Sequence, residues 1–220
     1  GGSTPKSLYE LLVSADEPFR GRIPWEKLEL FWGDERHVPP DHPDSNFRMA
    51  LEAMLDRVAV PPGNIHRIHA ELPDAAAAAA AYETTLRTVF ALAAGGWPRF
   101  DLVLLGLGEE GHTASLFPGS PLLGAGERRL AAAPWVPAQN TFRITLTPPV
   151  LNQAGKVLFM ISGAPKAPAL RHVLEGEYRP EVWPAQIVRP VAGSLIWLLD
   201  RAAASELSSL TSPGALHSPG

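Results

Sequence analysis

The sequence contains no cysteine, and this absence excludes two kinds of protein. Without cysteine the chain can form no disulfide framework, and it has no thiol nucleophile. The sequence also lacks the pattern G-x-S-x-G, which places a nucleophilic serine on a sharp strand-to-helix turn. A covalent mechanism based on cysteine, or on a serine in such a turn, is therefore excluded.

Basic residues are too few to indicate binding of nucleic acid. The 19 lysines and arginines are outnumbered by 23 acidic residues, which gives a net charge of −4. No apolar run reaches the length needed to span a membrane, and no signal-peptide pattern is present. We therefore expect a soluble, cytoplasmic protein that binds neither nucleic acid nor membrane. A local group of arginines and lysines could still bind an anionic substrate.

Buried apolar strands alternate with helices along the chain, which predicts an α/β fold. With 220 residues, of which 45% are hydrophobic, the chain can bury a full core. Continuous apolar strands favour an open, mostly parallel sheet with helices on both faces. We expect one domain over residues 1–204 and a disordered tail over 205–220, which is rich in Ser, Pro and Gly. The expected strands are 28–32, 102–105, 128–136, 141–147, 157–161 and 195–199, and the expected helices are 5–12, 46–58, 73–94 and a short one from Asp200.

The stretch 101–118, D-L-V-L-L-G-L-G-E-E-G-H-T-A-S-L-F-P, carries the strongest chemical signal. An apolar strand ends in three glycines, and His112 follows the last of them. Only a short helical turn can follow before Pro118. Ligands bind at the carboxyl ends of strands in open α/β sheets, and histidine suits proton transfer near neutral pH. Two alternatives therefore stand: His112 is a catalytic base, or it only caps or packs.

The same glycines match the dinucleotide-binding pattern G-x-G-x-x-G, but their context does not. That pattern requires a long helix and an acidic residue about 20 positions further on. Here Pro118 and Pro121 end the helix early, and residues 131–133 contain no carboxylate. We therefore predict no nicotinamide cofactor.

Two further segments are candidates for binding. The opening Gly-Gly-Ser-Thr precedes a helix, where free N–H groups and the helix dipole favour an anion, although an ordinary capped helix start explains it equally well. The loop 33–46 follows a strand and is crowded with charged residues and prolines, as in binding loops or solvated connections. The histidine pairs His37/His42 and His66/His69 lack a third ligand at a usual spacing, so we predict no metal site.

The motif G-L-G-E-E-G-H-T-A-S-L-F-P, at residues 106–118, resembles the signature of the 6-phosphogluconolactonases, within the glucosamine-6-phosphate isomerase/6-phosphogluconolactonase superfamily. W-G-D-E-R at 32–36, D-S-N-F-R at 44–48 and R-I-T-L-T-P-P at 143–149 are similar to other family elements. The resemblance extends to about Ala204 and implies a Rossmann-like open sheet. It implies hydrolysis of 6-phospho-D-glucono-1,5-lactone to 6-phosphogluconate in the oxidative pentose phosphate pathway. The alternatives are an amino-sugar phosphate isomerase/deaminase and a non-catalytic, truncated sugar-phosphate-binding homologue.

The resemblance also implies roles for individual residues. His112 would be the base that activates water, without metal or cofactor, and Asp34 and Arg36 would face the sugar ring and the reacting groups. The glycine-loop N–H groups, at Gly108 and Gly111, or Arg36 would stabilise the developing charge. The phosphate of the small-molecule lactone would be held by Gly2, Ser3, Thr4, Arg143 and Lys166.

The sequence departs from the family pattern in two places. Glu110 stands where the family usually has aspartate, which puts the role of that carboxylate in doubt. The strand–helix–strand that precedes the phosphate loop in the family is missing, so we expect the chain to be N-terminally incomplete. The resemblance further implies a functional association with glucose-6-phosphate dehydrogenase, the enzyme that supplies the lactone.

Overall fold

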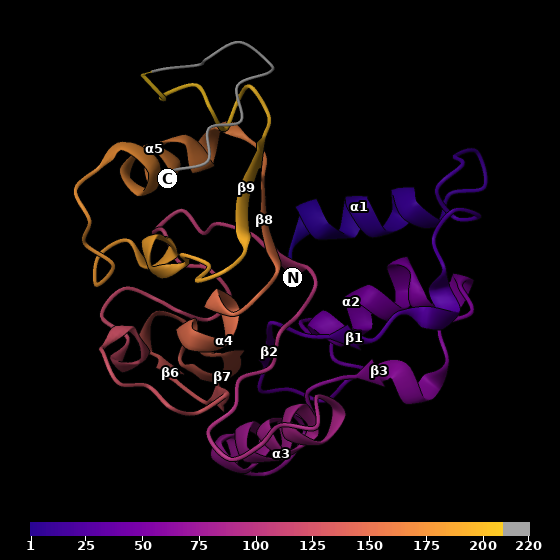
Figure 1. Ribbon diagram of the computed structural model, residues 1–220. Helices are drawn as coiled ribbons and strands as arrows, with labels where there is room; N and C mark the ends of the chain where they lie inside the picture. Colours follow the sequence, from indigo (N-terminus) through magenta and orange to yellow (C-terminus); the bar gives the residue numbers. More distant parts are fainter. Residues whose placement is uncertain (209–220) are drawn as a thin grey trace. The chain divides into compact units, whose positions relative to one another are not determined.

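The structure, a computed structural model, describes residues 1–208 and divides into two compact units (Figure 1). Unit 1 comprises Gly1–Gly96 and Arg128–Thr147, and unit 2 comprises Trp97–Glu127 and the chain from Pro148 onward. The single domain expected over 1–204 stays a prediction. Most of the expected disordered tail, residues 209–220, lies outside the described residues.

Unit 1 contains two small sheets. Strand β1, Leu30–Phe31, pairs in parallel with β3, Ile65–His66. The second sheet is antiparallel and is built on β7, Thr141–Leu146, which pairs with β2, Asp34–Arg36, with β5, Ala131–Ala132, and with β6, Trp135–Val136. The expected strand over 128–136 is thus two short strands, because Pro134 has no N–H to continue the ladder.

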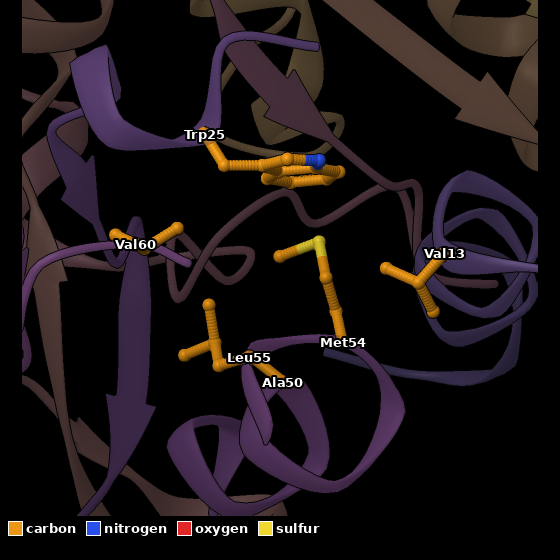
Figure 2. Close-up of a cluster of buried hydrophobic side chains, with 6 residues drawn as sticks. All are labelled: Val13, Trp25, Ala50, Met54, Leu55 and Val60. Atoms are coloured by element: carbon orange, nitrogen blue, oxygen red, sulfur yellow. The ribbon is translucent and has the colours of Figure 1, made fainter. Parts of the chain in front are cut away.

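Helices α1, Ser3–Val13, and α2, Asn46–Ala53, pack together over the apolar core of unit 1. The core side chains come from these helices, from short 3₁₀ turns and from the chain before β3 (Figure 2): Val13, Trp25, Ala50, Met54, Leu55 and Val60. The spacing of Leu8, Leu11 and Leu12 predicts the buried face of the first helix, and this was partly wrong, because Leu11 is 44% exposed whereas Val13 is buried. The helix 46–58 was predicted too long, since α2 ends at Ala53 and a 3₁₀ turn follows.

Helix α3, Ala75–Val89, packs against strands β5 and β7. It is shorter than the predicted 73–94. The Asp74 side chain caps its first turn by accepting from the Ala76 N–H at 3.1 Å, and beyond its end Ala91 leaves the helical conformation, with φ +47°. Its fully buried Tyr82 reaches the end of β1, where the hydroxyl accepts from the Trp32 N–H and donates to the Trp32 carbonyl, both at 2.9 Å. This one hydroxyl satisfies both backbone groups of a residue that leaves the sheet.

Unit 2 is built on a parallel sheet in the order β4, Val103–Leu105, β8, Lys156–Ile161, and β9, Ser194–Leu199. Its helices are α4, Pro148–Asn152, and α5, Ala167–Glu175. The helix expected from Asp200 is absent among the described residues. The Asp200 carboxylate instead accepts from the N–H groups of Gly163 and Ala203, at 3.0 and 2.7 Å, and turns follow.

The α/β fold with parallel strands is confirmed, and the antiparallel sheet around β7 adds to it. Within residues 1–208, no helix combines the length and the apolar character needed to cross a membrane.

We expect Tyr82→Phe to lower the free energy of unfolding by about 1–3 kcal/mol, because it removes the partner of two partly buried backbone groups of Trp32. Chemical denaturation monitored by circular dichroism measures this change. The matched control is Tyr178→Phe, which removes a hydroxyl from a residue that is 49% exposed and should change stability little. Equal stabilities of the two variants would refute the role given to the Tyr82 hydroxyl.

Candidate active site

The glycine turn that follows β4 forms a compact hydrogen-bonded loop. The Gly108 N–H donates to the His112 carbonyl at 2.8 Å, and the Gly111 N–H donates to the Gly108 carbonyl at 3.0 Å. The Thr113 hydroxyl donates to the Gly106 carbonyl at 2.9 Å. Gly111 has φ +76°, which a residue with a side chain rarely adopts. After His112 the chain makes a tight turn, bridged between Thr113 and Leu116, in place of the expected helical turn.

The imidazole of His112 packs against its own loop and stays partly exposed. A Cβ atom at Gly108 would lie far inside van der Waals contact with the ring, so only glycine leaves room for it. The ring stacks on Phe117, with centroids 4.2 Å apart and planes inclined by 21°. Its Nδ1 atom lies 3.3 Å from a carboxylate oxygen of Glu110, and 25% of the side chain is exposed. The ring therefore packs tightly on one face and remains accessible, so the catalytic and the packing alternatives both stay open.

The two glycines predicted to bind substrate use their N–H groups within the turn itself. The N–H groups of Gly108 and Gly111 already donate inside the turn, so neither can receive an oxyanion in this conformation. Their contribution is steric and conformational, through the space beside His112 and the positive φ.

The sequence predicts Lys166 in the first turn of a helix that follows the strand 157–161. In the structure Lys166 directly precedes α5, at the N-cap position. Its Nζ atom lies 3.6 Å from the carboxylate of Glu109, in the glycine turn, and 29% of its side chain is exposed. Two neighbouring carboxylates of the glycine turn thus have separate partners: Glu109 pairs with Lys166, and Glu110 pairs with His112. Unit 2 thus brings together the predicted residues Gly108, Gly111, His112 and Lys166.

In unit 1, a buried carboxylate fixes the loop that follows β1. Glu35 is only 2% exposed, yet its two oxygens accept from four donors. These are the N–H groups of Arg36, Asn46 and Phe47, at 2.9, 2.7 and 2.8 Å, and the Ser45 hydroxyl, at 3.1 Å. Burial raises the pKa of the Glu35 carboxyl, although the three backbone N–H groups oppose that rise. The carboxylate thereby ties β2 to the N-terminus of α2.

Asp34 lies beside Glu35 in β2 and is held by Asn46. The Asn46 amide donates to the Asp34 carbonyl at 2.9 Å and to its carboxylate at 3.3 Å. Gly1 also packs against the Asn46 side chain, since a Cβ atom at Gly1 would overlap it. The start of the chain, directly before α1, is therefore next to Asn46 and Asp34. Pro5 suits the first helical position and predicts Ser3 or Thr4 as the N-cap. This was wrong, because α1 starts at Ser3 after Gly2, which has φ +101°, and no side chain caps the helix.

Two arginines lie side by side across the antiparallel sheet. Arg36 of β2 and Arg143 of β7 are direct partners in the register, so their side chains leave the same face. The Arg36 guanidinium donates to the Asp44 carbonyl at 2.6 Å, and that of Arg143 donates to the Gln139 side chain. Arg143 is only 8% exposed, and burial together with the Arg36 charge lowers its pKa.

Both arginines retain buried donors: among the described residues, neither Nε atom has a hydrogen-bond acceptor. A bound anion would stabilise these two neighbouring cations, because it would supply acceptors to their buried donors. Arg143 is therefore buried although it lies between apolar strand residues, and the phosphate role that the resemblance gave it stays a prediction.

Sequence reasoning missed three residues that support these groups: Glu35, Asn46 and Phe117. All three lie inside the quoted motifs, so the signal was present, but a motif does not tell which member faces inward. Three of the histidines considered as metal ligands, His37, His66 and His69, have ordinary partners. His66 contacts Glu29 at 2.6 Å, His69 contacts Glu71 at 3.4 Å, and His37 contacts the Leu72 carbonyl at 2.8 Å. In residues 1–208 no three potential metal ligands of the His, Asp or Glu type gather.

The chain belongs to the glucosamine-6-phosphate isomerase/6-phosphogluconolactonase family, whose model matches residues 1–197. It is 46% identical to the 6-phosphogluconolactonase of Synechocystis sp., over 94% of this chain and 82% of that protein. Among solved structures, the 6-phosphogluconolactonase from Trypanosoma brucei is similar, with a TM-score of 0.81, 32% identity, and coverage of 94% of this chain and 84% of that one. A monomeric glucosamine-6-phosphate deaminase, at 22% identity, shares the fold with a TM-score of 0.77 over 94% of this chain and 85% of that one.

We expect Gly108→Ala to displace the His112 ring and to destabilise the protein by about 1–3 kcal/mol, because the added methyl group overlaps the imidazole. Gly106→Ala is the matched control, since a Cβ atom there meets nothing within 4 Å. The melting temperature and the NMR signals of the His112 ring measure the two effects. An unchanged ring environment in Gly108→Ala would contradict the packing described here.

Proposed function

We propose that this chain hydrolyses 6-phospho-D-glucono-1,5-lactone to 6-phosphogluconate, in the oxidative pentose phosphate pathway, without a metal or a cofactor. The observation that supports this most is the partly exposed imidazole of His112, held on a glycine turn with a carboxylate beside Nδ1. Such an arrangement suits a general base, and an activated lactone needs a base and charge stabilisation but no covalent nucleophile.

In the proposed reaction, His112 acts through Nε2. The Glu110 carboxylate favours a proton on Nδ1, so that the neutral imidazole would accept a proton from water through Nε2. The oxygen of that water bonds to the lactone carbonyl carbon as its proton moves to Nε2, and the carbonyl oxygen becomes an oxyanion. When the oxyanion collapses, the bond from the carbonyl carbon to the ring oxygen breaks. The imidazolium then returns its proton to the ring oxygen, and the product acid loses a proton to solvent.

We assign stabilisation of the oxyanion to Arg36 rather than to the glycine turn, because the N–H groups of Gly108 and Gly111 are already used. Asp34 would accept hydrogen bonds from substrate hydroxyl groups. Its orientation by Asn46 supports that assignment.

The phosphate would be bound through Arg143, with Gly2, Ser3 and Thr4 at the start of α1, and through Lys166. The buried, unsatisfied Nε of Arg143 supports this role, since a phosphate oxygen would supply its acceptor. Lys166 would exchange the Glu109 carboxylate for the phosphate on binding. Remote binding of this kind positions the reacting carbonyl. A cytoplasmic location and an association with glucose-6-phosphate dehydrogenase belong to the same proposal.

We expect His112→Ala to lower kcat by about 10²–10⁴-fold and to leave KM within a few-fold, because the base is lost but the phosphate contacts remain. The lactone is generated in situ and its product is coupled to a 6-phosphogluconate dehydrogenase, with a protein-free control for spontaneous opening. The matched control is His69→Ala, an exposed histidine in unit 1. The wild-type rate should fall in acid as the imidazole is protonated. Full turnover in His112→Ala would remove the residue from this role.

We expect Arg143→Lys to raise KM about 10–100-fold with a smaller change in kcat, because an ammonium cannot reproduce the planar guanidinium donors. The same assay measures this change. Arg57→Lys serves as the control, since the Arg57 side chain is exposed and no role is assigned to it. A KM that stays at the wild-type value would exclude Arg143 from phosphate binding.

A further inference from the structure

In unit 2, the segment 181–185 forms hydrogen bonds to the chain both before and after His112. The Ala185 N–H donates to the Gly111 carbonyl at 2.9 Å. The Gly119 N–H donates to the Glu181 carbonyl, also at 2.9 Å. The turn that carries the imidazole is therefore attached to this segment at both ends.

Trp183, in the middle of that segment, contacts the turn through its indole ring. A Cβ atom at Gly111 would lie 2.6 Å from Cε3 of Trp183 and 3.4 Å from its Cα atom. The indole also stacks on the ring of His172, in α5, with centroids 4.3 Å apart and planes inclined by 10°. Trp183 is thus packed between α5 and the residue that precedes His112.

The position of Trp183 is itself fixed by hydrogen bonds. Its N–H donates to the Arg179 carbonyl at 2.8 Å, and its carbonyl accepts from the Gln186 N–H at 3.0 Å. The buried Gln186 amide donates to the carbonyls of His172 and Glu177, both at 3.0 Å. The indole therefore forms a rigid support under a turn whose glycines could otherwise adopt many conformations.

We propose that Trp183 is a positioning residue, which holds the glycine turn so that Glu110 and His112 keep their relative placement. This inference rests on the proposed lactone hydrolysis, in which His112 is the base. Without the indole, Gly111 loses its packing partner, the turn relaxes, and the 3.3 Å approach of Glu110 to Nδ1 is lost. Displacement of a catalytic group by about 1 Å can lower a rate by about 10²-fold.

The test is the kinetics of Trp183→Ala and Trp183→Phe in the full chain. Trp183→Ala should lower kcat about 10–100-fold while KM stays within about 2-fold, because the phosphate contacts are unaffected. Trp183→Phe keeps a ring edge against Gly111 and should restore kcat to within about 3-fold of wild type. Trp135→Ala, which removes a tryptophan that is 46% exposed, should retain wild-type kinetics. A folded Trp183→Ala with wild-type kcat, or one in which only KM changes, would overturn the proposal.

A second measurement does not depend on turnover. Long-range ¹H–¹⁵N NMR of the imidazoles should show one His112 tautomer, protonated at Nδ1, in the wild type and in Trp183→Phe, and a mixture in Trp183→Ala. If the wild type does not hydrolyse the lactone, the proposed function fails, and this spectrum still tests the positioning. A single, unchanged tautomer in Trp183→Ala would refute the proposal. If Trp183→Ala does not fold, Trp183→Leu, which lacks the ring, takes its place with the same expectations.

Discussion

The candidate site in unit 1 depends on the hydrogen bonds that one buried carboxylate, Glu35, accepts. Its four donors join β2 to the start of α2, and in doing so they place Asp34 and Arg36 on either side of it. Burying a charge is unfavourable unless its hydrogen bonds are complete, and here both oxygens are fully engaged. The same bonds hold Asn46, which contacts Asp34 and Gly1. One side chain with no proposed contact to substrate thus arranges several that are proposed to bind it.

Unit 2 achieves a comparable result with steric fit in place of charge. The His112 ring packs between Gly108, which leaves room for it because it has no side chain, and the Phe117 ring. Trp183 packs against Gly111. The carboxylates of Glu109 and Glu110 then pair with Lys166 and His112. The extra methylene of Glu110, compared with the usual aspartate of the family, still allows a carboxylate oxygen to reach 3.3 Å from Nδ1. The departure from the family pattern is therefore compatible with the proposed role.

The sequence predicted the positions of the long strands well, because apolar runs such as 157–161 have few alternatives in a folded chain. It predicted helix ends poorly, since those depend on single caps such as Asp74 and on tertiary contacts. Motifs indicated His112, Asp34, Arg36 and Arg143 as candidates, but not the adjacency of the two arginines, which results from the register of β2 with β7. The roles of Glu35 and Trp183 were not predicted, for a similar reason. Composition shows that a residue is charged or aromatic, whereas its partners come from segments distant in sequence.

The most direct test of this account compares two substrates. The full chain is given the 6-phosphogluconolactone, generated in situ, and separately glucosamine 6-phosphate, and both products are followed by NMR. The account predicts that the lactone opens well above its spontaneous rate, whereas the amino sugar releases no ammonia. Ammonia release without faster lactone opening would contradict the account and favour the deaminase alternative. If neither substrate reacts, in a chain that circular dichroism shows to be folded, the assignment of a catalytic role to His112 would also fail.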